Sequence, residues 1–100
     1  MLSRELESKI VAGGVCEVYA SPTAELSSLH CSVFDGHLTK LCHDLKIVVP
    51  TVNFAFYVSS ERYGIHLPAD LSAETAKRVV DLFKSSKIQV TEDAHFGALF

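Results

Sequence analysis

Residues 51–67, TVNFAFYVSSERYGIHL, form two runs in which apolar and polar residues alternate. Alternation with a period of two places successive side chains on opposite faces and is typical of a half-buried β-strand. The apolar positions of the first run, residues 51–59, are Val52, Phe54, Phe56 and Val58. Those of the second run, residues 62–67, are Tyr63, Ile65 and Leu67. The stretch therefore predicts an antiparallel β-hairpin with one apolar face.

The same alternation predicts a register in which Val58 lies opposite Tyr63. The next inner pairs are then Phe56 with Ile65 and Phe54 with Leu67. A slip of one residue would move the whole apolar set to the other face, so the pattern specifies the pairing strongly. In this register Tyr57 lies across from Gly64 on the outer face, where an aromatic ring can cover a strand glycine.

The residues after the hairpin predict an amphipathic helix that begins after Ser72 and runs to about Lys84. Serine is a favourable N-cap because its hydroxyl accepts a bond from a free backbone N–H. The apolar stripe of this helix is wide enough to cover one face of a sheet, and consists of Ala73, Ala76, Val79, Val80 and Phe83. We expect it to pack on the inner face of the hairpin. A short final strand is expected over residues 88–90.

The N-terminal part predicts a helix over residues 3–12 and a strand over residues 15–20, separated by Gly13-Gly14. Glycine suits the end of a helix because it adopts the left-handed conformation without strain. Residues 23–34 fit either a helix or a strand. We expect a helical or irregular start that becomes a strand near Leu29.

In the middle of the chain, Asp35-Gly36 is a turn signal. Residues 37–45 have apolar side chains at helical spacing, which predicts a helix. Residues 47–49, IVV, predict a short strand.

These elements predict an α+β fold, with a mainly antiparallel sheet of four or five strands and two or three helices packed on one face. The chain has 100 residues, of which 48% are hydrophobic and 21% charged, and we interpret residues 1–100 as a single domain. The net charge of −3 gives no electrostatic case for nucleic-acid binding. No apolar run approaches the roughly 18 residues of a membrane-spanning helix, so we expect no membrane partner.

Three cysteines, an odd number, do not suggest a disulfide framework, and the first residues lack the layout of a secretory signal. We therefore expect a soluble, cytoplasmic protein. Histidine and cysteine cluster at His30-Cys31, His37 and Cys42-His43. Adjacent residues diverge on a strand or a helix, so this cluster does not predict a zinc site, and we expect neither a metal nor a cofactor.

No catalytic motif stands out, so the sequence does not favour an enzyme. The strongest functional signal is surplus apolar surface, because Leu82 lies off the main stripe of its helix and residues 94–100 form an apolar C-terminal tail. The interface candidates are Leu82, Phe96, Leu99 and Phe100. The first hypothesis is a small intracellular regulatory protein that acts by protein–protein binding as a homodimer.

The second hypothesis is a small enzyme or ligand-binding protein with a site at a sheet edge or subunit interface. Its candidate residues are Cys31, His37, Tyr57 and His66. A weaker third hypothesis is a nucleic-acid-associated regulator, because Lys77, Arg78, Lys84 and Lys87 lie on or just after the C-terminal helix. Acidic residues interrupt that surface, so an ordinary solvated helix face explains it as well.

Overall fold

The structure is a computed structural model that describes residues 2–15, 17–23, 31–57 and 62–92. The elements in chain order are α1 (Arg4–Val11), β1 (Glu17–Pro22), α2 (Cys31–Val48), β2 (Asn53–Tyr57), β3 (Arg62–His66), α3 (Ala73–Ser85) and β4 (Ile88–Thr91).

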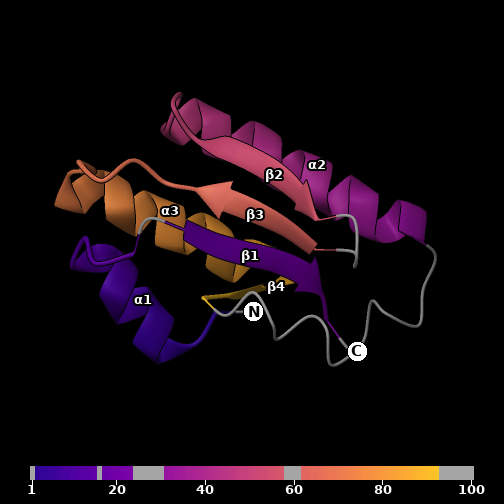
Figure 1. The fold of residues 1–100 in the computed structure, drawn as a ribbon, viewed down its shortest axis with the longest axis horizontal. Helices are drawn as coiled ribbons and strands as arrows, with labels where there is room; N and C mark the ends of the chain where they lie inside the picture. Colours follow the sequence, from indigo (N-terminus) through magenta and orange to yellow (C-terminus); the bar gives the residue numbers. More distant parts are fainter. Residues whose placement is uncertain (1, 16, 24–30, 58–61, 93–100) are drawn as a thin grey trace.

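The four strands form one antiparallel sheet in the order β2-β3-β1-β4 (Figure 1). Helix α2 connects β1 to β2 with β3 between them, and α3 connects β3 to β4 with β1 between them. This is the split βαβ arrangement called ferredoxin-like, here preceded by α1. The predicted α+β class is confirmed.

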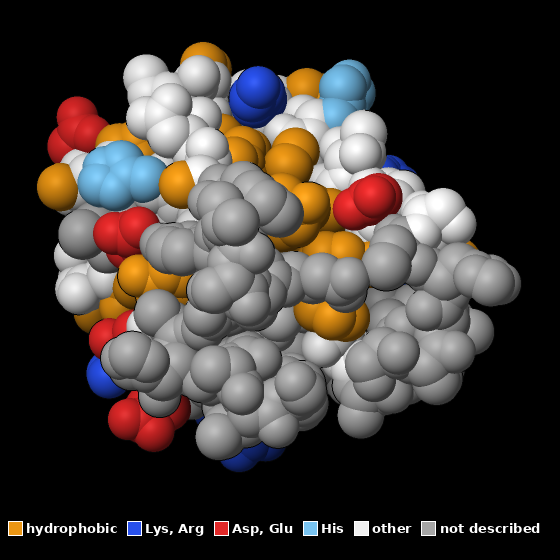
Figure 2. Space-filling model, turned by 45° about the vertical axis from the view of Figure 1, so that its right-hand side comes forward, with side chains coloured by type: hydrophobic (Ala, Val, Ile, Leu, Met, Phe, Trp, Pro, Cys, Tyr) orange, Lys and Arg blue, Asp and Glu red, His pale blue; other side chains and the backbone are white. Residues whose placement is uncertain are grey.

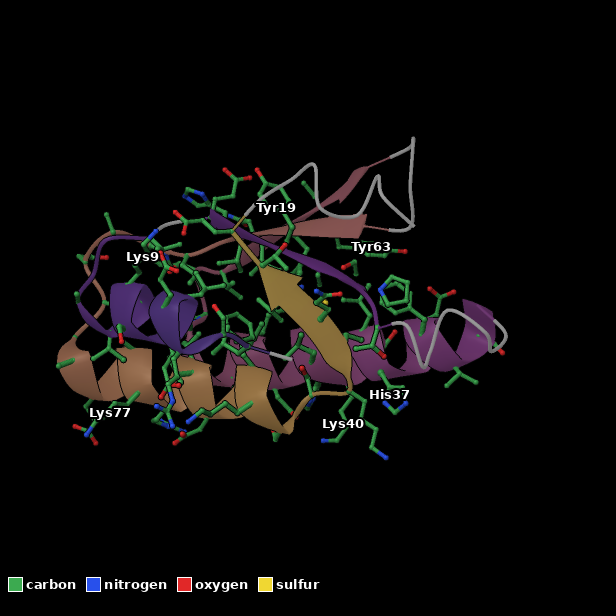
Figure 3. All side chains as sticks on the ribbon, turned by 90° about the horizontal axis from the view of Figure 1, so that it is seen from below. Lys9, Tyr19, His37, Lys40, Tyr63 and Lys77 are labelled. Carbon is green, nitrogen blue, oxygen red and sulfur yellow. The ribbon has the colours of Figure 1, made fainter. Side chains whose placement is uncertain are left out.

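The three helices lie on one side of the sheet, as Figure 3 shows from below. Helix α3 is the middle one, because it contacts both α1 and α2. An ion pair between Lys84 Nζ and Glu7 Oε1, at 3.0 Å, also links α3 to α1. Helix α2 therefore stands at the end of the helix layer.

The core lies between the sheet and the helices. Its strand residues include Val18, Ala20, Ile65, Ile88 and Val90. Its helix residues include Leu38, Leu41, Leu45, Val79, Val80 and Phe83. The predicted packing of the hairpin against the helix stripe is confirmed for Ile65 and Leu67, and Phe54 packs against the same cluster. The side chain of Phe56 lies outside the described part.

The predicted hairpin is confirmed, but its predicted register is wrong by two residues. Tyr63 lies opposite Phe56 rather than Val58, and Gly64 lies opposite Ala55 rather than Tyr57. A slip of two residues leaves every side chain on its own face, so alternation alone cannot detect it. The residue facing Gly64 from the other side, on β1, is Tyr19.

The middle of the chain differs from the expectation, because α2 is continuous from Cys31 to Val48. The expected strand over residues 31–34, the turn at Asp35-Gly36 and the strand start at residues 47–48 are therefore wrong. Phe34, Leu38, Leu41 and Leu45 are all buried at helical spacing. Burying this long stripe outweighs the local preferences of Gly36 and of the β-branched residues Ile47 and Val48. Residues 24–30 lie outside the described part.

The ends of α1 and α3 follow the predicted signals. Ser3 accepts a hydrogen bond from the backbone N–H of Leu6, and Gly13 adopts a positive φ of 78° after the helix. Ser72 accepts a hydrogen bond from the backbone N–H of Thr75. The predicted strands over residues 15–20 and 88–90 correspond to β1 and β4.

Candidate functional site

A hollow of about 230 Å³ lies between α2 and the C-terminal end of α3. Helix α2 contributes His37, Lys40, Leu41 and Asp44. Helix α3 and the turn that follows it contribute Leu82, Ser85, Ser86 and Lys87. Figure 3 shows His37 and Lys40 at this end of the helix layer, and Lys77 at the opposite end.

A second, more open hollow continues the first along the two helices. It is lined by Val48, Arg78, Asp81, Leu82 and Ser85. Because Leu82 and Ser85 line both hollows, we treat them as one surface and name it the α2/α3 groove. In the first hollow, residues 37–44 in the middle of α2 meet the end of α3, and in the second, Val48 at the end of α2 meets residues 78–85 of α3. The two helices therefore run antiparallel.

The groove follows from helical periodicity on α2. His37, Leu41, Asp44 and Val48 recur at intervals of three or four residues, which places them on one flank of the helix. The inward flank carries Leu38 and Leu45, both buried. Each turn of α2 therefore gives one residue to the core and one to the groove.

The groove has an apolar floor. Leu41 is buried in the core cluster, while Leu82 and Val48 are only partly buried against it. Leu82 and Val48 are accessible in part because the space above them is open. An apolar side chain from another molecule could cover them and remove that surface from water.

The charges at the first hollow are unequal. Among the described lining residues its one carboxylate is Asp44, which accepts a hydrogen bond from Lys40 Nζ at 3.0 Å, and whose other oxygen lies 3.5 Å from His43 Nδ1. The bonds from Lys40 and His43 hold the pKa of Asp44 below its ordinary value of 3.8. Lys87 has no ion-pair partner within residues 2–15, 17–23, 31–57 and 62–92. The rim therefore has surplus positive charge.

The two serines of the groove stabilise the end of α3. Ser85 Oγ donates to the Leu82 carbonyl at 3.0 Å, and Ser86 Oγ donates to the Phe83 carbonyl at 2.8 Å. These bonds satisfy carbonyls that a helix end leaves free. No hydrogen bond joins either serine to His37 in the described part of the chain, so a nucleophile–base pair is not formed there.

The structure brings together two residues that the sequence assigned to different hypotheses. His37, a ligand-site candidate, and Leu82, an interface candidate, both line the α2/α3 groove. His66 is exposed on β3, between Asn53 and Glu17 of the neighbouring strands. His37 and His66 therefore belong to different layers of the molecule.

The remaining candidates are spread over the chain. Cys31 is the first residue of α2, and Tyr57 is the last residue of β2, opposite Arg62. The side chains of Cys31 and Tyr57 and the candidates Phe96, Leu99 and Phe100 lie outside the described part.

Sequence reasoning missed Lys40 and Asp44, and it considered Lys87 only as part of a basic helix surface. Lys40 and Asp44 stand three and seven residues from His37, which was a usable signal that they lie near it on the helix. The pairing of α2 with α3 follows only from the topology.

The basic residues of the C-terminal helix point in several directions. Lys84 pairs with Glu7, Lys87 lines the first hollow and Arg78 lines the second. In Figure 2 the described Lys and Arg side chains lie apart from one another around the margin of the visible face. They do not form one basic patch on this face.

Within the described residues, no three His, Cys, Asp or Glu side chains gather as they would around a metal ion. No described helix combines the length and the apolar character needed to cross a membrane. Comparison of the chain with models of known protein families, with curated proteins and with solved structures gives no match in any of the three. Since unrelated functions share the split βαβ topology, the groove rather than the fold must support a functional proposal.

Proposed function

We propose that this chain works by binding other protein chains, with the α2/α3 groove as a docking surface. The observation that supports this is the combination in one groove of an apolar floor at Leu82 and a cation, Lys87, that forms no ion pair with the described residues. An apolar floor with a charged rim is the usual composition of a surface that binds a peptide or a partner helix.

The chemistry of the groove defines its occupant as an acidic segment that carries a large apolar side chain. The apolar side chain covers Leu82, and a carboxylate of the segment pairs with Lys87. Lys40 already binds Asp44, so its charge is largely satisfied within the chain. Lys87 therefore contributes most of the charge preference of the first hollow, while Arg78 and Asp81 bring one charge of each sign to the second.

The proposal includes self-association of the chain as a homodimer in the cytoplasm. The apolar residues near position 100, including Leu99 and Phe100, support self-association. The odd number of cysteines and the free thiol of Cys42 support a reducing compartment.

The groove is tested with a display library of random peptides selected on the full chain and then measured against variants. We expect the recovered peptides to be rich in Asp or Glu and to contain a Leu, Ile, Phe or Trp. Binding should fall by about tenfold in Lys87→Glu, because the substitution replaces attraction by like-charge repulsion. Leu82→Lys should weaken binding further, because it introduces a charge into the apolar floor.

The matched control is Lys77→Glu, which makes the same charge change on α3 away from the groove. This variant should bind the peptides as the wild-type chain does. Peptides that bind Lys87→Glu and Leu82→Lys as tightly as the wild-type chain would refute the groove as the docking surface, as would a selection that recovers no binder.

A further inference from the structure

The side of α2 that faces away from the core exposes apolar side chains. Of the three large apolar side chains that are exposed among the described residues, two belong to α2, namely Val33 at 37% and Ile47 at 64%. Val33, Lys40 and Ile47 recur every seven residues and therefore lie on one flank of the helix, which we name the outer flank. This flank leaves apolar surface in water near both ends of α2.

The middle of the outer flank is charged and open. Lys40 is exposed, and its Nζ bonds to the carboxylate of Asp44 one turn further along the helix, at 3.0 Å. Gly36, one turn before Lys40, is also exposed, and a β-carbon there would meet no atom within 4 Å. A glycine at such a position lets a group of another molecule approach the helix closely.

We infer that the outer flank of α2 binds the outer flank of a second copy of this chain, antiparallel, about a two-fold axis at Lys40. This deepens the self-association that forms part of the proposed function, and rests on it. The axis sets Val33 level with Ile47 of the second copy, and Ile47 level with its Val33. The pair is then held by two identical apolar contacts, about 21 Å apart along the helices.

The charges near the axis are self-complementary, which is a second, independent reason for this partner. The same register sets Asp44 of the second copy level with Gly36, one turn from Lys40. Lys40 therefore stands between two carboxylates, its own Asp44 on one side and the Asp44 of the second copy on the other. Two lysines and two carboxylates alternate around the axis, so every charge has neighbours of the opposite sign.

The place of α2 in the molecule leaves room for the second copy. Its buried side chains, including Leu38 and Leu45, face the core, and the outer flank faces the opposite way. Helix α2 also stands at the end of the helix layer, outside β2 (Figure 1). The axis therefore lies beyond α2, and each copy keeps its sheet and its other helices on the far side of the paired helices. Antiparallel helices that meet through residues at seven-residue spacing have the geometry of a short coiled coil.

The mass of the full chain in solution, measured by light scattering and by sedimentation at rising concentration, tests this inference. We expect the wild type to approach twice the chain mass of 10.9 kDa. Ile47→Lys puts a charge into each apolar contact, so we expect a monomer. Ala55→Lys is the matched control and should remain a dimer. Ala55 is exposed on the other side of the sheet from the helices, because its neighbour Phe54 packs against the core.

A charge exchange tests the position of the axis. Asp44→Lys should weaken the dimer by about tenfold, because it gathers four lysines around the axis. The double variant Lys40→Asp/Asp44→Lys makes the charges alternate again and should restore the dimer. Asp35→Lys is the matched control for charge, because Asp35 is exposed on another flank of α2. Circular dichroism of each variant verifies that it is folded.

The outcomes separate this inference from the rest of the proposed function. A dimer that survives in Ile47→Lys and in Asp44→Lys would overturn the outer flank and leave self-association through another surface. A double variant no more dimeric than Asp44→Lys would overturn the axis at Lys40. A wild-type chain that stays monomeric at millimolar concentration would overturn both this inference and self-association. Lys87→Glu, which tests peptide binding in the groove, should leave the mass unchanged.

Discussion

His37 of α2 and Leu82 of α3 line the same hollow, while Phe83, the neighbour of Leu82, is fully buried in the core. Adjacent residues of one helix therefore have different roles. Phe83 holds the helix on the sheet, and Leu82 forms part of an open groove.

This difference predicts unequal effects on stability. Phe83→Ala should lower the free energy of unfolding by about 3–5 kcal/mol, because it leaves a closed cavity in the core. Leu82→Ala should lower it by about 1–2 kcal/mol, because water can fill an open groove. Urea unfolding at a fixed protein concentration measures both. Equal losses would mean that Leu82 is sealed in the core and is not available to a partner.

Two glycines predict opposite effects of the same substitution. A β-carbon added at Gly36 or at Gly13 would meet no atom within 4 Å, so alanine causes no steric clash at either position. Gly36 lies inside α2, where alanine is the better helix former, and Gly36→Ala should stabilise the fold by about 0.5–1 kcal/mol.

Gly13 has a φ of 78°, which alanine adopts only with strain. Gly13→Ala should therefore destabilise the fold by about 1–2 kcal/mol. Thermal unfolding of the two variants beside the wild type shows whether each substitution raises or lowers the stability of the fold. Destabilisation by Gly36→Ala would indicate that residue 36 is not in a regular helix.

The hairpin shows what the sequence can and cannot predict. Alternation identified both strands and their inner face, because a half-buried strand must bury every second side chain. It could not fix the register, because moving from the pair Val58–Tyr63 to the pair Phe56–Tyr63 keeps every residue on its face. The register depends on the turn between the strands, and the apolar pattern contains no information about that turn.

Helix α2 shows a different limit of prediction from local sequence. Local signals at Asp35-Gly36 and at Ile47 predicted a turn and a strand, yet both positions are helical. The helix is stabilised mainly by burying an apolar stripe, from Phe34 to Leu45, against the sheet. The groove was unpredictable for the same reason. Its two halves come from helices whose pairing depends on the whole topology.

The N-cap of α3 predicts a loss of stability that is local and chemically specific. Ser72 Oγ accepts a hydrogen bond from the Thr75 backbone N–H at 3.1 Å. Ser72→Ala removes this bond and should lower the free energy of unfolding by about 1 kcal/mol. Ser72→Asp keeps an acceptor at the same place and should stay close to the wild type. If the alanine and aspartate variants unfold at the same urea concentration, the cap contributes nothing to stability.

Asp44 predicts a pH effect whose sign follows from its partners. Lys40 and His43 bond to the carboxylate, so its pKa in the folded chain lies below the ordinary 3.8. A carboxyl with a lowered pKa contributes stability that is fully present above about pH 3.8. That contribution is lost as the pH falls through the folded value. The Lys40–Asp44 pair is exposed, so its effect on the pKa is easier to detect than its effect on stability.

A nuclear magnetic resonance titration of the Asp44 carboxyl carbon measures this pKa directly. We expect a midpoint below 3.8 in the wild type and a higher midpoint in Lys40→Met, because the hydrogen bond from Lys40 is the largest cause of the shift. Lys77→Met removes a lysine outside the groove and should leave the midpoint of Asp44 where it is. A midpoint that does not move in Lys40→Met would mean that Lys40 does not hold the carboxylate in solution. Lys40 would then join Lys87 as a free cation at the rim of the groove, and the preference for an acidic partner would be stronger.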